Sequence, residues 1–132
     1  MIHIPQYTYV YAFDVDHTLE ISDGPVPISH LEMLHSLGHI VGICGNFARL
    51  VQSVPTWKLW CNFIGSMAMT KADFLLQIKT YVPAHNYYMV GNDARIKQYL
   101  HPVSFDGLFA EEAGWNFILE EKWAEHFKQF TS

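Results

Sequence analysis

The sequence predicts an α/β fold: a three-layer α/β/α sandwich built around a five-stranded, mostly parallel sheet. Short apolar, β-prone runs alternate along the whole chain with stretches whose apolar residues recur at helical spacing. Strands joined by helices in this way pair in parallel through right-handed crossovers. The length of 132 residues fits a single domain, residues 1–132, without room for a second folded unit.

Five runs are predicted to be strands. The first, Tyr7–Phe13, is an almost unbroken apolar run, which is typical of a strand covered on both faces, so we expect it near the centre of the sheet. The other four are expected at His39–Cys44, Cys61–Gly65, Tyr87–Val90 and Trp115–Leu119.

Helices are predicted between these strands. Ser29 and Glu32 have the spacing of a capping box, and Gly38 is expected to end the helix that they begin. A short helix is expected from Phe47 to about Val54. Two further helices have apolar stripes at helical spacing. They comprise Phe74, Leu75, Ile78 and Val82 in a helix that begins near Lys71, and Leu119, Trp123, Phe127 and Phe130 in the closing helix.

The composition excludes several classes of protein. Half of the residues are hydrophobic and 16% are charged, so the chain can bury a core and is not disordered. The net charge of −5 argues against non-specific nucleic-acid binding. No apolar run reaches the roughly 18–20 residues of a membrane span, and Met1–Gln6 lacks the layout of a signal peptide. Cys44 and Cys61 lie in apolar stretches and are expected to be reduced core thiols, so we expect a cytoplasmic protein with no membrane partner.

Polar residues follow three of the predicted strands. Asp14 and Asp16 follow the first strand, Gly45-Asn46 follows the second, and Gly91-Asn92-Asp93 follows the fourth. Residues two apart in an extended segment point to the same side, so the first two carboxylates are expected to converge at the carboxyl edge of the sheet. Mg²⁺ would keep such close acids ionised. The sequence therefore predicts a Mg²⁺ site formed by Asp14, Asp16 and Asp93.

The segment Asp14-Val15-Asp16-His17-Thr18 resembles the first motif, Asp-x-Asp-x-Thr, of the haloacid dehalogenase-like hydrolases. Three later segments resemble that family's remaining motifs in order. They are Gly45-Asn46, Lys71 and Val90-Gly91-Asn92-Asp93. The resemblance spans the whole chain and implies a Rossmann-like core domain.

What this resemblance implies is a Mg²⁺-dependent phosphomonoester hydrolase. Asp14 would be the nucleophile that forms an aspartyl-phosphate, and Asp16 would be the general acid and base, with its backbone carbonyl on the metal. Lys71 would neutralise charge on Asp14 and on the phosphoryl oxygens, although Lys58 or Lys79 could be the family lysine instead. The implied phosphate-binding residues are Thr18, Gly45 and Asn46.

Departures from the family pattern leave alternatives open. Gly45 stands where the family has Ser or Thr, so the alternative function is a catalytically weak binding or regulatory module that holds metal and phosphate. Asp106 is interpreted as a second acid that an insertion, about Lys97–Ser104, separates from Asp93. His17 is interpreted as facing solvent rather than substrate. A phosphoacceptor receiver domain is disfavoured because the third strand ends without an acid.

The chain leaves no room for a cap domain. The segments 16–39 and 46–71, where the family inserts caps, are too short to fold separately. An uncapped site implies a large or extended phosphorylated substrate, or a homo-oligomer whose neighbouring subunit supplies the lid. Trp57, Leu59 and Trp60 could form such a contact surface, but packing over the sheet edge is the favoured interpretation.

Overall fold

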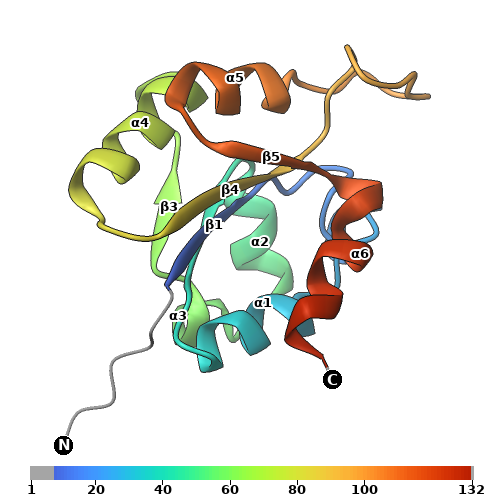
Figure 1. Ribbon diagram of the computed structural model, residues 1–132. Coiled ribbons are helices and arrows are strands. Elements are labelled where there is room, and N and C mark those ends of the chain that lie inside the picture. The colour runs from blue at the N-terminus through green and yellow to red at the C-terminus, as the bar shows by residue number, and fades with distance from the viewer. Residues whose placement is uncertain (1–7, 132) are drawn as a thin grey trace, which may run out of the picture.

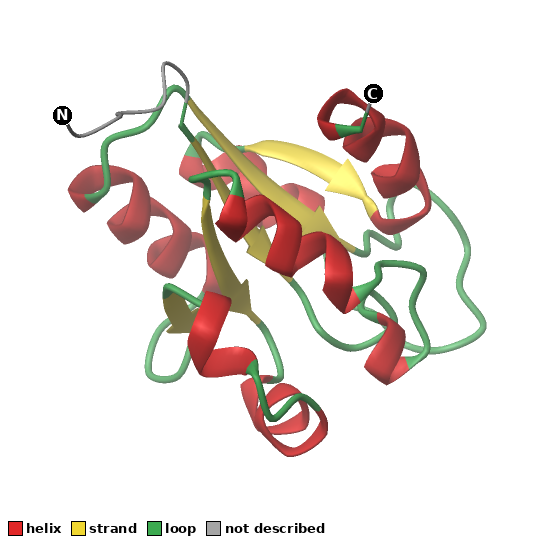
Figure 2. Ribbon diagram, turned by 90° about the horizontal axis from the view of Figure 1, so that it is seen from below, coloured by secondary structure: helices red, strands yellow, loops and turns green. Residues whose placement is uncertain are grey.

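A computed structural model describes residues 8–131, and its centre is one five-stranded sheet (Figure 1). All neighbouring strands pair in parallel, in the order β3-β2-β1-β4-β5, and Figure 2 shows them side by side. The strands are β1 (Tyr9–Phe13), β2 (Ile40–Cys44), β3 (Phe63–Gly65), β4 (Asn86–Gly91) and β5 (Asn116–Leu119). The central place of the first strand is confirmed, whereas Met1–Gln6 and the predicted strand start at Tyr7 lie outside the described residues.

The register of β1 determines which residues follow the sheet at its carboxyl edge. Phe13 lies opposite Ile43 in β2 and Val90 in β4. The three strands therefore end at nearly the same level, which brings together the segments that begin at Asp14, Gly45 and Asn92. Ligands bind at this edge in open parallel sheets.

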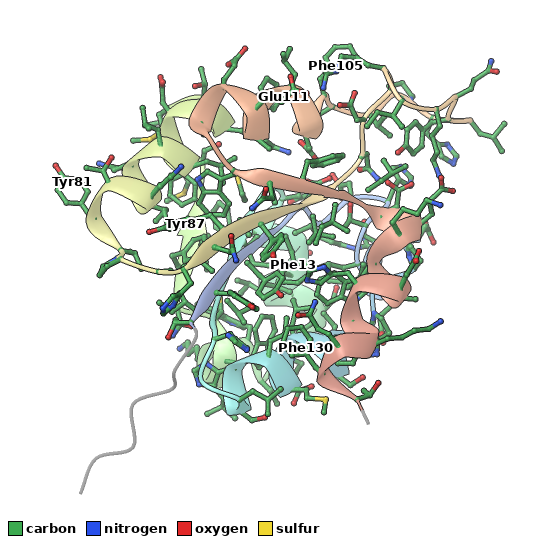
Figure 3. All side chains as sticks on the ribbon, in the orientation of Figure 1. Phe13, Tyr81, Tyr87, Phe105, Glu111 and Phe130 are labelled. Atoms are coloured by element: carbon green, nitrogen blue, oxygen red, sulfur yellow. The ribbon has the colours of Figure 1, made fainter. Side chains whose placement is uncertain are left out.

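Helices connect the strands, and side chains from both faces of the sheet pack against them. The helices are α1 (Ile28–Ser36), α2 (Phe47–Ser53), α3 (Trp57–Trp60), α4 (Lys71–Tyr81), α5 (Asp106–Ala113) and α6 (Trp123–Phe127). Tyr11 and Phe13 belong to a core cluster with residues of α1, α2, α3 and α6, whereas Val10 and Ala12 belong to a second cluster with residues of α4 and α5. This alternation follows from the two-residue period of a strand. Figure 3 shows Phe13 in the interior and Tyr81 at the surface.

The predicted capping box at the start of α1 is wrong. The helix begins at Ile28, one residue before Ser29, and Pro27 precedes it without a side-chain cap. The backbone N–H of Ile28 donates instead to Glu20 Oε2 at 3.0 Å. The carboxylate of Glu20, which lies outside the segment that flanks the helix start, thus accepts from a backbone amide that has no partner within the helix. Gly38, at φ 93°, is confirmed as the residue after the helix end.

The closing helix is shorter than predicted. Only Trp123–Phe127 is α-helical, and the 3₁₀ turns η2 (Glu120–Lys122) and η3 (Lys128–Phe130) flank it. Trp123 and Phe127 are buried as the stripe predicts, while Leu119 ends β5. The short helix α3 was not predicted. Within it Trp60 packs in the core. None of the described helices is long and apolar enough to cross a membrane.

Candidate functional site

An open cavity of about 430 Å³ lies at the carboxyl edge of the sheet. Its lining comprises Asp14, Asp16, His17, Gly45, Asn46, Ser66, Lys71, Asn92, Pro102, Val103 and Ser104. Five of the residues predicted from the sequence are among these, and Thr18 is buried next to Asp14. Asp93 is not part of the lining.

Lys71 reaches this cavity from the first turn of α4. The helix begins there because Thr70 caps it, its hydroxyl accepting the Asp73 N–H at 3.1 Å. Lys71 Nζ lies 3.2 Å from Asp14 Oδ1 and 2.9 Å from Asp106 Oδ1. The alternative lysines are elsewhere. Lys79 donates to the Gly114 carbonyl, and Lys58 lies over the ring of Trp57.

Asp14 is almost completely buried, which changes its protonation. Burial and the nearby charge of Asp106 raise the pKa of its carboxyl, Lys71 lowers it, and the resulting value is about 7. Burial alone would lower the pKa of Lys71, but attraction to Asp14 and Asp106 raises it above its ordinary value. Lys71 therefore stays charged and stabilises the carboxylate form of Asp14.

Asp16 lies at the mouth of the cavity, exposed to solvent. Its Oδ1 accepts hydrogen bonds from the Ser22 hydroxyl at 3.0 Å and from the Asn46 side-chain amide at 3.3 Å. The carbonyl of the same Asn46 side chain accepts the N–H of Arg49 and caps α2. The carboxylate of Asp16 is thus held in place at the start of a helix while water can still reach it.

Asp93 does not join the other two acids, which corrects the predicted three-carboxylate set. Arg95 holds its carboxylate with Nε at 3.1 Å from both oxygens and a terminal nitrogen at 2.7 Å from Oδ2. Burial would raise the pKa of Asp93, but the bonds from Arg95 lower it below the ordinary value. Among residues 8–131, no group of three or more His, Cys, Asp or Glu side chains is arranged to hold a metal.

Asn92, rather than the predicted Asp93, lines the cavity beside Thr18. Consecutive residues after a strand point to opposite sides, so only one of Asn92 and Asp93 can face Asp14. The Thr18 hydroxyl lies 3.4 Å from both Asn92 Oδ1 and Asp14 Oδ2. Asn92 also donates from Nδ2 to the His17 carbonyl at 3.1 Å. Its position directly after β4 is the signal that could have identified it.

Asp106 is fully buried at the start of α5 and joins three segments of the site. Besides Lys71, it accepts the Ser104 hydroxyl at 2.7 Å and the Asn92 N–H at 3.1 Å. From the sequence, Asp106 is interpreted as a second acid that an insertion separates from Asp93. The structure places it behind the lysine, where it does not line the cavity.

The absence of a side chain at Gly45 has a steric reason. A Cβ atom added there would lie 2.4 Å from Asp14 Oδ1, so no larger residue fits while Asp14 keeps its present position. The N–H of Gly45 is already bonded to the Gly65 carbonyl at 2.9 Å. This backbone donor, which we expected to contact a phosphoryl group, is therefore in use.

His17 is partly exposed and lines the open cavity, so its interpretation as facing solvent rather than substrate stays a prediction. Its imidazole stacks on that of His101, with ring centroids 4.5 Å apart and planes 4° apart. The partner belongs to the segment predicted as an insertion, and this segment also supplies Pro102, Val103 and Ser104 to the cavity.

Comparisons with known proteins found no matching family model, no similar curated protein and no similar solved structure. The resemblance of the segment Asp14–Thr18 to a known motif therefore stays an expectation.

Proposed function

We propose that the protein is a Mg²⁺-dependent phosphomonoester hydrolase whose Asp14 accepts the phosphoryl group as an aspartyl-phosphate. The observation that carries the proposal is the contact between Lys71 and Asp14 at the carboxyl edge of a parallel sheet. In this proposal the chain is a three-layer, Rossmann-like sandwich without a cap domain, and its substrate enters the open cavity directly.

Lys71 supports a nucleophilic role for Asp14. A carboxylate needs no base to activate it once it is ionised, but it repels an anionic phosphoryl group. The ammonium group at 3.2 Å favours the ionised form of Asp14 and offsets part of this repulsion. As the transferring group spreads its charge over its oxygens, the same cation stabilises that charge.

Asp16 suits the role of general acid and base. It lies two residues after Asp14 at the cavity mouth, and its carboxylate is both oriented by Asn46 and open to water. It can therefore protonate a leaving oxygen and later take a proton from the water that attacks the acyl phosphate. Asn46 and Thr18 orient the two acids, and we propose that they also border the phosphoryl site.

The oxygen donors around Asp14 fit Mg²⁺. Lys71 is shared between Asp14 and Asp106, and Asp16 adds another carboxylate, so negative charge exceeds positive charge at this end of the cavity. Mg²⁺ prefers one or two carboxylates with further oxygen ligands. Asp14, the backbone carbonyl of Asp16 and Asn92 Oδ1 would hold it. The ion would supply positive charge that reduces the repulsion between nucleophile and phosphoryl group.

The openness of the cavity indicates what kind of substrate it could accept. It suits a large or extended phosphoester, or a homo-oligomer in which a second subunit covers the opening.

The cysteines are free, and burial raises the pKa of Cys44 to about 12, so this thiol is unreactive. These features support the proposed cytoplasmic location.

A second candidate is a module that binds metal and phosphate but turns over poorly. Gly45 supplies no hydroxyl, its N–H is bonded to Gly65, and the Asn46 amide is bonded to Asp16. Few donors from the end of β2 are thus left for a phosphoryl group. Each charge-assisted hydrogen bond that is lost costs about 1.5–3 kcal/mol.

Hydrolysis of p-nitrophenyl phosphate with Mg²⁺ separates these candidates. We expect turnover by the wild type and a loss of roughly 10³-fold or more in Asp14→Asn. Asp73→Asn is the matched control, the same chemical change on an exposed residue of α4. Unchanged activity in Asp14→Asn would exclude Asp14 as the nucleophile. Calorimetric binding of phosphate without turnover of any phosphoester in a broad panel would select the binding module.

A further inference from the structure

The loop between β4 and α5 forms one wall of the cavity. It projects beyond the helices in Figure 1, in gold, and returns to the cavity through Pro102, Val103 and Ser104. His101, directly before them, stacks on His17 from the segment that follows β1. The loop is therefore joined to the opposite side of the cavity by two parallel rings.

His17 lies at the boundary between two hollows. A second hollow of about 410 Å³ has both His17 and His101 in its lining, whereas only His17 also lines the cavity over Asp14. While His101 covers one face of its imidazole, His17 borders the cavity over Asp14. It lies in the same cavity as the apolar side chains of Pro102 and Val103.

The backbone of His17 is held by two hydrogen bonds. Its φ of 57° is in the left-handed region, its N–H donates to the Ser22 carbonyl at 2.7 Å, and its carbonyl accepts the Asn92 amide at 3.1 Å. His101 stacks on the ring of His17. A flat ligand that stacks on His17 would meet a surface that is already ordered, so binding would cost little side-chain entropy.

We propose that the cavity selects phosphoesters whose leaving group carries a planar ring, which stacks on His17 with Pro102 and Val103 opposite and with His101 as a positioning residue behind. This inference rests on the proposed function, because it takes the phosphoryl group to lie at Asp14. An aryl group and a nucleobase share the required chemistry. Parallel ring contacts favour a flat group over a saturated one of equal size.

Two phosphonates test the preference without turnover, because their C–P bond is not a phosphoester. Benzylphosphonate and cyclohexylmethylphosphonate have equal numbers of carbon atoms and differ in the flatness of the ring. With wild-type protein and Mg²⁺, calorimetry should show roughly three- to tenfold tighter binding of the benzyl compound. Aromatic ring currents should also shift the NMR signals of the two imidazoles.

Three variants test whether the preference for the benzyl compound depends on the His17 imidazole. His17→Asn removes the imidazole yet tolerates a positive φ, so it should abolish the preference. His101→Ala should reduce the ratio of the two affinities. Ile96→Ala, on the same loop but in the lining of neither hollow, should leave the ratio unchanged.

Several outcomes would overturn the inference. Equal affinities of the wild type for both compounds would do so, as would a ratio that survives His17→Asn. Equal weakening of both compounds in His101→Ala would mean that His101 only holds the loop, which would refute its place in the stack. A benzyl preference in a protein that hydrolyses no phosphoester would support the planar site while refuting the phosphatase.

Discussion

Lys71 Nζ lies 2.9 Å from Oδ1 of Asp106, although 35 residues separate the two in the chain. Asp106 is fully buried and its other hydrogen bonds come from Ser104 and the backbone of Asn92. Asp106 therefore holds the ammonium group of Lys71 while that group also contacts Asp14. A lysine side chain has many rotamers, so this second contact determines where its charge is placed.

Asp106→Asn should destabilise the fold and change the titration of Asp14. Loss of a buried charge-assisted hydrogen bond should lower the free energy of unfolding by about 1.5–3 kcal/mol, measured by urea denaturation. The pKa of Asp14 should fall below its value of about 7, because the charge of Asp106 contributes to raising it. NMR titration of the metal-free protein measures this. Glu112→Gln, on the exposed face of the same helix, should change neither quantity.

Gly45→Ser should reduce turnover rather than improve it. The new Cβ would displace the Asp14 carboxylate, and a misplacement near 1 Å costs roughly 10²-fold in rate. Steady-state kinetics with p-nitrophenyl phosphate checks this, with Ala124→Ser at an exposed position of α6 as control. A rate increase in Gly45→Ser would show instead that the missing hydroxyl limits catalysis.

Asn92 and Asp93 should differ in their effect on Mg²⁺. Asn92→Ala should raise the Mg²⁺ concentration needed for half-maximal activity by at least about tenfold. Asp93→Asn should leave this concentration unchanged, because its carboxylate is bonded to Arg95 and does not line the cavity. Metal titration of the hydrolysis rate measures both variants. The reverse order of effects would return the ligand role to Asp93.

Acid should weaken the packing around His39. Its Nδ1 accepts the Tyr9 N–H at 3.1 Å, and burial lowers its pKa from 6.5. The neutral ring therefore contributes stability above the pKa of the unfolded chain, and this contribution is lost as the pH falls through the lower pKa of the folded state. The pKa values of His30 and His126 are lowered for the same reason.

Urea denaturation at about pH 7.5 and about pH 5 tests this expectation. As the pH falls, loss of the His39 contribution should decrease the free energy of unfolding of the wild type, whereas protonation of Asp14, whose pKa is raised, acts in the opposite direction in wild type and variant alike. In His39→Asn an amide oxygen can replace the acceptor and no group titrates, so the decrease should be smaller. An equal decrease in both proteins would contradict a contribution from this histidine.

Much of the fold could be predicted because it depends on local patterns. The unbroken apolar run that ends at Phe13 requires burial on both faces, and this places β1 at the centre. The helix start at Lys71 follows from the cap at Thr70 and the apolar spacing behind it. The start of α1 was missed because its first amide is satisfied by Glu20, a residue outside the local pattern.

The sequence by itself determined the order of strands and helices and the presence of polar residues at the carboxyl edge. These follow from hydrophobic periodicity, a local pattern that can be recognised within each short segment of the sequence. Only the tertiary structure decided that Asn92 rather than Asp93 faces Asp14, that Asp106 holds Lys71, and that His17 stacks on His101. Such contacts depend on the twist of the sheet and on the paths of the loops. Several residues could pair with a given charge or ring, and sequence spacing alone does not distinguish among them.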